Sequence, residues 1–463
     1  MRFFFNPFLL LLVFPHLNSQ YMDKHTPWKL EGANERIEKY RKGTAKIEFY
    51  KEGKKVNTRG DIDLKLINHE FKFGVSMTQS RGLMQRGESF ESPDFIFYKE
   101  KVKEIFNFIT IGMYWYALDN TRTNFEKDMR NYISHVIEWG LKNDLEIKGH
   151  PLLWHESNPK WVENNKNPKK LEKEIYYRIK SLIEDYPEIK YWDVYNEAVA
   201  AFKNHVKPNG VSRWIEYNGG TEKTIVDLYS FVNNVNSEKI YTNNHYNPND
   251  PDFFDLNKFM IDNNVKFDAI GMQAHMQTKS STLSENELWN LMESFKPLGK
   301  KIQFTELSVT SSVKFNDWKD HQEFLKKRSE ARKIGKEMNL PSLKKLENYQ
   351  SAYISDFYTL VFSHPSVTSL TYWNLFDKNA WRGHASGLVD SQNNEKKAFY
   401  TLKKLIKEKW NTNISETKID LRNSFKFKGF YGTYSGKLKI SDKIYDFTFL
   451  HKKNSSDIIK INL

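Results

Sequence analysis

The stretch YWDVYNEA, residues 191–198, is an apolar run with the composition of a buried β-strand, and it carries the polar pair Asn196 and Glu197 near its end. A second run, KIQFTELSV (301–309), has the same form and contains Glu306. Short runs rich in aromatic and β-branched residues are typical of strands inside a sheet. The two runs therefore predict buried strands that each present a glutamate near the carboxyl end.

Six more runs of this kind occur between residues 71 and 377, and amphipathic segments with a helical period separate them. They are FKFGVSM (71–77), FNFITIGM (106–113), LEIKGHPLLW (145–154), KIYTNNHY (239–246), FDAIGMQAHM (267–276) and VTSLTYWNLFD (367–377). Eight strands that alternate with helices predict an α/β fold, a (β/α)8 TIM barrel. An open doubly wound sheet is the competing fold, but no glycine-rich phosphate loop follows the first strand.

Segments rich in predicted strands flank the barrel on both sides. Residues 44–70 have the pattern of two strands around a Gly/Lys turn, and the tail alternates apolar and polar residues between glycine turns. We expect a β-rich segment at 21–70, the catalytic barrel at 71–408 and a second β-rich segment at 409–463. Packing onto the barrel is favoured over carbohydrate binding as the role of these small appendages.

The first 20 residues have the layout of a secretory signal peptide, with Arg2, an apolar run at 3–14 and a short polar stretch. This run is too short to favour a membrane span, although an uncleaved N-terminal anchor is the alternative. We expect a secreted, extracellular protein with no membrane association after cleavage. The chain has no cysteine, which excludes disulfides and thiolate metal sites.

The formal net charge of +13 comes mostly from dispersed lysines that alternate with acidic residues. This pattern is typical of solvated helix faces and not of a nucleic-acid-binding stripe. A basic surface can still attract acidic polysaccharide over a distance. The histidines lack metal-ligand spacing, so we expect no metal and no cofactor, and we expect a monomer.

Between the seventh and eighth predicted strands, residues 314–348 form a long charged excursion. We expect it to be helical and to precede a further helix at 350–362. Connections that follow barrel strands lie at the catalytic face. The excursion is therefore a candidate lid or cleft wall.

The predicted strand ends carry the residues with chemical uses, and in a barrel these ends meet on one face. Glycoside hydrolysis needs one carboxyl group that protonates the leaving oxygen and a second that attacks the sugar carbon or activates water. Glu197 and Glu306 fit this requirement, provided that their surroundings push their pKa values apart. A single glutamate at a strand end is more often a solvated loop residue, but the pair in its aromatic context favours catalysis.

Seven ordered blocks of the chain resemble glycoside hydrolase family 10, the retaining endo-β-1,4-xylanases. The blocks are KGHPLLWHESNPKWV (148–162), WDVYNEAV (192–199), YTNNHYN (241–247), IGMQAHM (270–276), FTEL (304–307), TYWNLFDKNAWR (371–382) and GLVDSQNNEKKAFYTL (387–402). The resemblance implies that Glu197 is the acid/base and Glu306 the nucleophile. It also implies that the subsites nearest the bond cut are lined by His150, Trp154, Asn196, Gln273, His275, Trp373 and Trp381.

Two departures from the family pattern indicate an altered sugar pocket. The end of the stretch FNFITIGMYWYAL (106–118) lacks the acidic, amide and lysine residues that family members carry there, and it offers Tyr114 and Trp115 as stacking surfaces. Ser308 stands where the family commonly has an acid. His275 is therefore expected to lack an anionic partner and to be protonated less readily near neutral pH.

These features predict a secreted retaining endo-glycosidase that hydrolyses β-1,4-xylosidic bonds in xylan-type polysaccharide. One alternative is a barrel glycosidase on another β-linked glycan, such as mixed-linkage glucan or a decorated xylan. A second alternative, from a different class, is a non-hydrolytic carbohydrate-binding relative. The presence of both glutamates argues against this last alternative.

Overall fold

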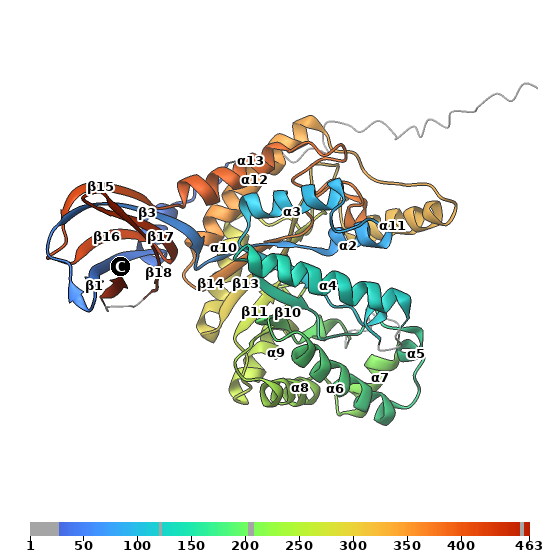
Figure 1. The fold of residues 1–463 in the computed structure, drawn as a ribbon. Helices are drawn as coiled ribbons and strands as arrows, with labels where there is room; N and C mark the ends of the chain where they lie inside the picture. The colour runs from blue at the N-terminus through green and yellow to red at the C-terminus, as the bar shows by residue number, and fades with distance from the viewer. Residues whose placement is uncertain (1–26, 120–122, 202–207, 454–457) are drawn as a thin grey trace, which may run out of the picture.

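The computed structural model describes residues 27–119, 123–201, 208–453 and 458–463. The expected signal peptide at 1–20 lies outside the described residues. Figure 1 shows a large barrel surrounded by helices and a smaller β module at one end of it.

The large body is a closed barrel of eight parallel strands, which confirms the fold predicted from the sequence. Its strands are β4 (Lys72–Ser76), β5 (Phe108–Gly112), β6 (Glu146–His150), β8 (Tyr191–Asp193), β10 (Ile240–His245), β11 (Ala269–Met272), β13 (Lys301–Val309) and β14 (Val367–Tyr372). Each strand pairs with the next in this order, and β14 pairs with β4, so the ring closes. All the strand ends that carry the candidate residues therefore face the same side.

Helices connect successive strands and cover the outside of the barrel (Figure 1). They are α2 (Thr78–Gln85), α3 (Pro93–Ile105), α4 (Asn124–Lys142), α5 (Lys160–Glu163), α6 (Pro168–Asp185), α7 (Gly210–Tyr217), α8 (Thr221–Val235), α9 (Pro251–Asp262), α10 (Glu285–Phe295), α11 (Trp318–Lys333), α12 (Lys344–Ser363) and α13 (Lys397–Lys404). Ser284 and Glu287 form a capping box that starts α10. In the described part of the chain, no helix combines the length and apolarity needed to cross a membrane.

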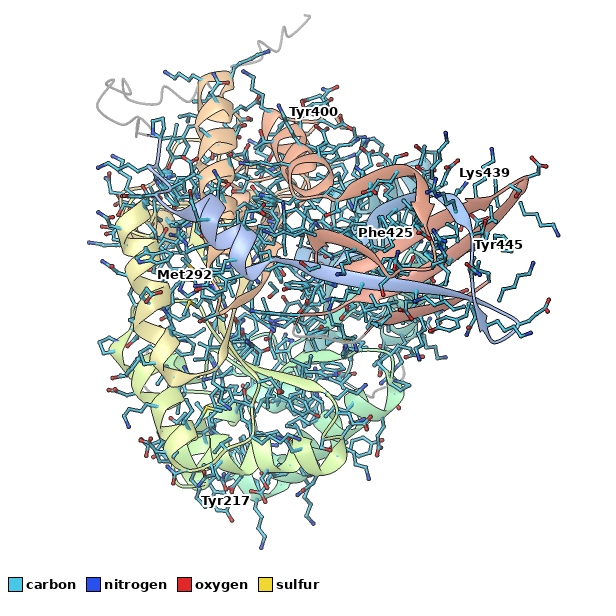
Figure 2. The ribbon with its side chains drawn as sticks, turned by 90° about the vertical axis from the view of Figure 1, so that its left-hand side faces the viewer. Tyr217, Met292, Tyr400, Phe425, Lys439 and Tyr445 are labelled. Carbon is cyan, nitrogen blue, oxygen red and sulfur yellow. The ribbon has the colours of Figure 1, made fainter. Side chains whose placement is uncertain are left out.

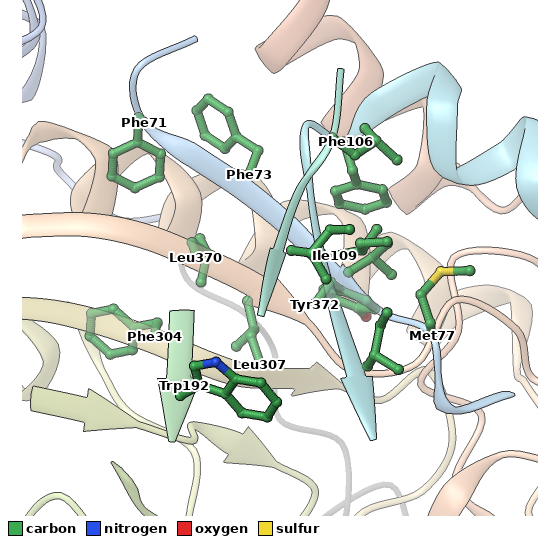
Figure 3. Packing of buried hydrophobic residues seen from close by; sticks show 14 of the residues in the cluster. Phe71, Phe73, Met77, Phe106, Ile109, Trp192, Phe304, Leu307, Leu370 and Tyr372 are labelled. Carbon is green, nitrogen blue, oxygen red and sulfur yellow. The ribbon is translucent and has the colours of Figure 1, made fainter. Parts of the chain in front are cut away.

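Aromatic and aliphatic side chains form the core around the barrel strands, as Figure 3 shows for Trp192, Phe304 and Leu307, and Phe304 packs on Phe357 of the outer helix α12. Trp192 is fully buried, and Gly149 on the neighbouring β6 leaves room for it. A Cβ atom at Gly149 would lie 2.1 Å from the indole ring. A glycine is therefore required at this position if Trp192 is to pack against β6.

The two β-rich flanks predicted from the sequence are joined in one module of two sheets. One sheet contains β1 (Lys42–Lys51), β2 (Lys54–Lys55), β16 (Phe425–Phe430) and β19 (Ile459–Asn462), and the other contains β3 (Arg59–His69), β15 (Asn413–Asp420), β17 (Gly432–Ile440) and β18 (Lys443–His451). The N-terminal strands β1 and β3 each pair with strands from the C-terminal flank. A short helix, α1 (Ala33–Tyr40), precedes the module.

The module packs against the amino-terminal end of the barrel, because β3 ends at His69 and runs directly into β4. Aromatic contacts fill this junction: the His69 and Phe73 rings lie 5.4 Å apart, and those of Phe362 and Trp410 lie 4.5 Å apart. On the outer side, Lys439 extends away from the barrel (Figure 2). The module therefore lies at the opposite end of the barrel from the strand ends that carry the glutamates.

The charged excursion after β13 contains α11 and a non-helical stretch, and α12 begins at Lys344, earlier than the sequence predicts. The Arg382 guanidinium lies 4.5 Å from the ring centroid of Trp318 at the start of α11. Arg328, also in α11, donates a hydrogen bond to the Ala380 carbonyl (3.0 Å). The excursion therefore packs against the loop that follows β14, at the carboxyl end of the barrel.

Candidate active site

Two short pairings beyond the barrel ring hold the site residues in place. β7 (Leu153–Trp154) pairs with β9 (Tyr195–Asn196), which sets Trp154 opposite Asn196. β12 (His275–Met276) pairs with β13 and sets His275 opposite Ser308. The backbone therefore fixes these side chains on both sides of the barrel mouth.

Glu197 is held by two donors and by a strained backbone. Its carboxylate accepts a hydrogen bond from Gln273 Nε2 (2.7 Å) and another from Trp154 Nε1 (3.2 Å). Its φ of 59° lies in the left-handed region, and its backbone N–H donates to the Asn244 carbonyl at 2.8 Å. Such strain at a non-glycine residue persists where the surrounding structure imposes one side-chain direction.

Burial raises the pKa of Glu197 to about 7, because the cleft disfavours its charged form. The hydrogen bond from Gln273 opposes this shift, and the negative charge of Glu306 adds to it. Near neutral pH a large fraction of Glu197 is therefore protonated. A carboxyl group in this state can give a proton to a leaving oxygen.

The pKa of Glu306 is shifted in the opposite direction from that of Glu197. Its carboxylate accepts from Asn244 Nδ2 (3.1 Å) and contacts His275 Nε2 (3.1 Å), and His150 Nε2 lies 3.9 Å away. Burial alone would raise the pKa of Glu306, but the His275 hydrogen bond and the nearby imidazoles outweigh it and lower the pKa below its usual value. At a pH where Glu197 still holds its proton, Glu306 is therefore ionised. Glu197 can then act as the acid and Glu306 as the nucleophile or base.

His275 links Glu306 to Ser308. Its Nδ1 lies 2.9 Å from Ser308 Oγ, and Ser308 donates its own proton to the Trp373 carbonyl (2.6 Å). Burial lowers the pKa of His275, although its hydrogen bond with Glu306 raises it in part. This lowered pKa is the direction expected from a serine in place of an acid.

A buried ion pair between Lys148 and Asp193 holds the His150 ring in place. Lys148 Nζ lies 2.6 Å from Asp193 Oδ1, and both side chains are at most 2% exposed. The other oxygen of Asp193 accepts from His150 Nδ1 at 2.8 Å. Burial lowers the pKa of His150, but the Asp193 bond and the charge of Glu306 outweigh burial, so its pKa is raised. The raised pKa favours the charged form of His150, and that charge in turn favours the carboxylate form of Glu306.

Asn244 connects the surroundings of the two glutamates. Its Nδ2 donates to Asn196 Oδ1 (2.9 Å) as well as to Glu306, and its Oδ1 accepts from Thr305 Oγ1 (2.7 Å). These bonds fix the amide orientation of Asn244 and hold Asn196 directly beside Glu197. A sugar hydroxyl that binds Asn196 would therefore be positioned relative to both carboxyl groups.

Several predicted aromatic residues surround this group. The His150 ring lies 5.7 Å from Trp373 and 5.9 Å from Tyr114, and the His275 ring lies 4.7 Å from Trp381. These rings form the apolar walls that sugar faces stack on.

Trp115 has a different environment from the other aromatic residues predicted to line the site. It is 5% exposed and lies 5.7 Å from Trp161 and 5.3 Å from the Arg178 guanidinium. The contacts above connect the other predicted site residues to one another, whereas the ring contacts of Trp115 are with Trp161 and Arg178.

In the described part of the chain, no group of three or more His, Asp or Glu side chains is placed to hold a metal ion. The geometry is that of two carboxyl groups in different protonation states, surrounded by amides, imidazoles and indoles. Residues 65–405, most of the chain, match the sequence model of glycosyl hydrolase family 10. The chain belongs to glycosyl hydrolase family 10. It is accordingly a glycoside hydrolase.

Curated relatives of this family 10 protein are distant in sequence. Endo-1,4-beta-xylanase A of Caldicellulosiruptor saccharolyticus is 27% identical over 279 residues, which are 57% of this chain and 72% of that protein. The anti-sigma-I factor RsgI6 of Acetivibrio thermocellus is 23% identical over 456 residues, which are 96% of this chain and 50% of that protein. The second match extends through the β-rich flanks.

Solved structures share the fold. The family 10 structure from Paenibacillus barcinonensis has a TM-score of 0.56 at 19% identity and covers 73% of this chain and 95% of its own. Native xylanase 10B from Thermotoga maritima has a TM-score of 0.55 at 19% identity and covers 74% of this chain and 96% of its own. Both likenesses support the barrel.

Asn244 lies near the end of a predicted strand, among the polar residues expected to meet on one face, but its link between the two glutamates was not predicted. The Lys148–Asp193 ion pair could not be predicted from the sequence, because both residues lie inside apolar strands and their pairing depends on how β6 and β8 align.

Proposed function

We propose that this family 10 glycoside hydrolase is a secreted retaining endo-β-1,4-xylanase that acts on xylan-type polysaccharide. The observation that carries the proposal is the opposite pKa displacement of the two glutamates, with Glu197 raised to about 7 and Glu306 lowered. In a retaining mechanism Glu306 attacks the sugar carbon while Glu197 protonates the leaving oxygen. Glu197 then activates the water that releases the sugar from Glu306.

The xylanase names of the distant relatives support xylan as the substrate. The aromatic walls and the amide of Asn196 suit a neutral pyranose chain, because indole and phenol rings stack on sugar faces and amides bind hydroxyls. Release of reducing ends from xylan, arabinoxylan, glucuronoxylan and mixed-linkage glucan tests this substrate class. Faster hydrolysis of the glucan than of every xylan would contradict it.

The retaining mechanism is tested with Glu306→Ala. Hydrolysis should be abolished, and azide should restore activity by forming a product of inverted anomeric configuration, because a small anion fills the space of the missing carboxylate. The wild-type product should keep its configuration in an NMR time course. Turnover in Glu306→Ala without azide, at the wild-type rate, would remove Glu306 from the mechanism.

The role of Glu197 is tested with Glu197→Ala on aryl glycosides of graded leaving-group pKa. Substrates with acidic phenols need little protonation, so their hydrolysis should survive best. An equal loss on all leaving groups would contradict the acid role.

A non-hydrolytic carbohydrate-binding protein is the second candidate. A relative that matches across 96% of this chain is named as an anti-sigma factor and not as a hydrolase, so a role without hydrolysis is tested as well. The intact pair of oppositely tuned glutamates favours the hydrolase. Retained binding of all four glycans without any reducing-sugar release would decide for the second candidate.

Secretion and a monomeric state complete the proposal. The apolar run at 3–14 supports export. N-terminal sequencing of protein recovered from the medium should start after residue 19 or nearby, and its mass in solution should correspond to 55.0 kDa less that segment. An intact N-terminus in the membrane fraction would instead indicate an anchor.

A further inference from the structure

Arg81 carries a positive charge without a partner at the barrel mouth. It lies in α2, which follows β4 at the carboxyl end of the barrel. Its buried Nε and Nη1 atoms have no hydrogen-bond partner among the residues the structure describes. No carboxylate of the described residues forms an ion pair with it, whereas Arg86 at the end of the same helix pairs with Glu88 at 3.3 Å. An unpaired guanidinium donor is costly unless a ligand satisfies it.

Two tyrosine rings flank this guanidinium. Its central carbon lies 5.5 Å from the ring centroid of Tyr114 and 5.9 Å from that of Tyr116. The two rings are nearly parallel, with centroids 6.2 Å apart, and Tyr116 stacks in turn on Phe125 at 6.5 Å. Because Tyr116 and Phe125 are 37% and 40% exposed, this row of rings reaches from Arg81 to the surface.

The same row reaches the catalytic group at its inner end. Tyr114 lies 6.1 Å from the ring of Trp154, whose indole nitrogen donates to Glu197. Gly112 allows this approach, since a Cβ atom there would lie 2.8 Å from the Tyr114 ring. Arg81 is therefore separated from the residues that hold Glu197 by a single aromatic ring.

We propose that Arg81, Tyr114 and Tyr116 form a subsite for a uronic acid, with the guanidinium binding the sugar carboxylate and the tyrosine rings stacking on the sugar. This inference rests on the proposed function and deepens it. The main chain of a xylan is neutral, so the carboxylate belongs to a uronic acid branch. A guanidinium binds a carboxylate through charge-assisted N–H bonds, and Nη2, which is not among its buried unpartnered atoms, is the nitrogen that the carboxylate reaches first.

The test compares one substrate in two chemical forms. Glucuronic-acid-branched xylo-oligosaccharides are used as they are and after reduction of the carboxyl group to an alcohol, which removes the charge and keeps the branch. Wild-type kcat/KM should be at least about tenfold higher on the acidic form, and the ratio should fall with added salt. Equal kcat/KM on the two forms would overturn the proposal without any variant.

Variants then assign the preference to Arg81. Arg81→Gln should abolish the ratio by lowering kcat/KM selectively on the acidic form, while Arg81→Lys should keep part of the ratio. Arg86→Gln is the matched control on the same helix and should keep the whole ratio. A proportional loss on both forms in Arg81→Gln would show a structural role and overturn the proposal.

Binding to the inactive Glu306→Ala protein separates this inference from the proposed function. Calorimetric titration should show tighter binding of the acidic form, lost when Arg81→Gln is added to that background. Hydrolysis of both forms at equal rates would contradict the uronic acid subsite but not the proposed xylanase activity. Tighter binding of the acidic form through Arg81, without hydrolysis of either form, would contradict the proposed xylanase activity and support the subsite. Tighter binding of unbranched polygalacturonate than of the branched xylan would identify a main-chain uronic acid and overturn the branch assignment.

Discussion

Ser308 accepts a hydrogen bond from Nδ1 of His275 at 2.9 Å, because its own single proton goes to the Trp373 carbonyl. The proton of a neutral His275 therefore resides on Nδ1. The other nitrogen, Nε2, faces Glu306 at 3.1 Å and can donate to that carboxylate only when the ring is an imidazolium. Ser308 thus makes the contact between His275 and the nucleophile depend on the charge of the ring.

Replacing Ser308 with aspartate should raise the pKa of His275. An adjacent carboxylate stabilises the imidazolium, typically by about 1–3 pKa units. The raised pKa keeps the His275–Glu306 ion pair intact to higher pH. An NMR pH titration of the His275 ring measures the shift. Ser308→Asn is the matched control, since it has the same shape without the charge, and an equal shift in the two variants would refute the electrostatic explanation.

The fall of kcat/KM at alkaline pH, the alkaline limb of the activity profile, should follow the deprotonation of Glu197. The acid must be protonated, and its pKa is about 7, so kcat/KM should fall as the pH rises through that value. Gln273→Met removes a donor that favours the carboxylate, so the pKa of Glu197 should rise and the limb should move to higher pH. The position of the limb is the measurement, whatever the absolute rate. A limb that stays in place or moves to lower pH would contradict this assignment.

Replacing Glu197 with glutamine should stabilise the protein at alkaline pH only. The pKa of Glu197 is about 7 in the folded chain against 4.5 for the unperturbed group, so the folded state binds the extra proton and loses stability as the pH rises between these values. At pH 8 the variant should be more stable by on the order of 1–3 kcal/mol. Thermal melts at pH 4.5 and pH 8 measure this, and a stability gain of the same size at both values would rule out the linkage.

Breaking the buried Lys148–Asp193 pair should destabilise the barrel. Lys148→Met leaves the Asp193 charge buried with His150 as its remaining partner, and such a loss costs about 3–5 kcal/mol. Chemical denaturation measures the difference in unfolding free energy. Adding Asp193→Asn to Lys148→Met removes the uncompensated charge and should recover part of the stability. A double variant as unstable as the sum of both single variants would mean that the two charges do not interact.

The sequence predicted the barrel because its signals are local. Each strand is a short apolar run that is buried on both faces, as in β5, where all five residues are buried. Several helices begin at side-chain caps that neighbouring residues supply, such as Ser92 before α3 and Ser284 before α10. Glu197 and Glu306 could be selected for the same reason, since barrel strands of one direction bring their ends to one face.

Other features could not be read from the chain, because they depend on distant segments meeting. The two flanks form one module only because β1 and β3 pair with strands from the far end of the sequence. The sequence placed Trp115 in the site, and its ring contacts with Trp161 and Arg178 depend on how the loops after β5 and β6 meet α6. Arg81 lies on a helix and not at the end of a predicted strand, so the sequence did not indicate that it would lie near the site.

The sequence by itself determined the barrel, the two glutamates and the family to which they belong. Only the tertiary structure decided which glutamate holds a proton, because burial, amide donors and imidazole charges act on Glu197 and Glu306 from β6, β10, β11 and β12. Local patterns fix where a side chain stands along a strand. Its charge state depends on the solvent exclusion and the partners that the closed barrel brings within a few ångströms.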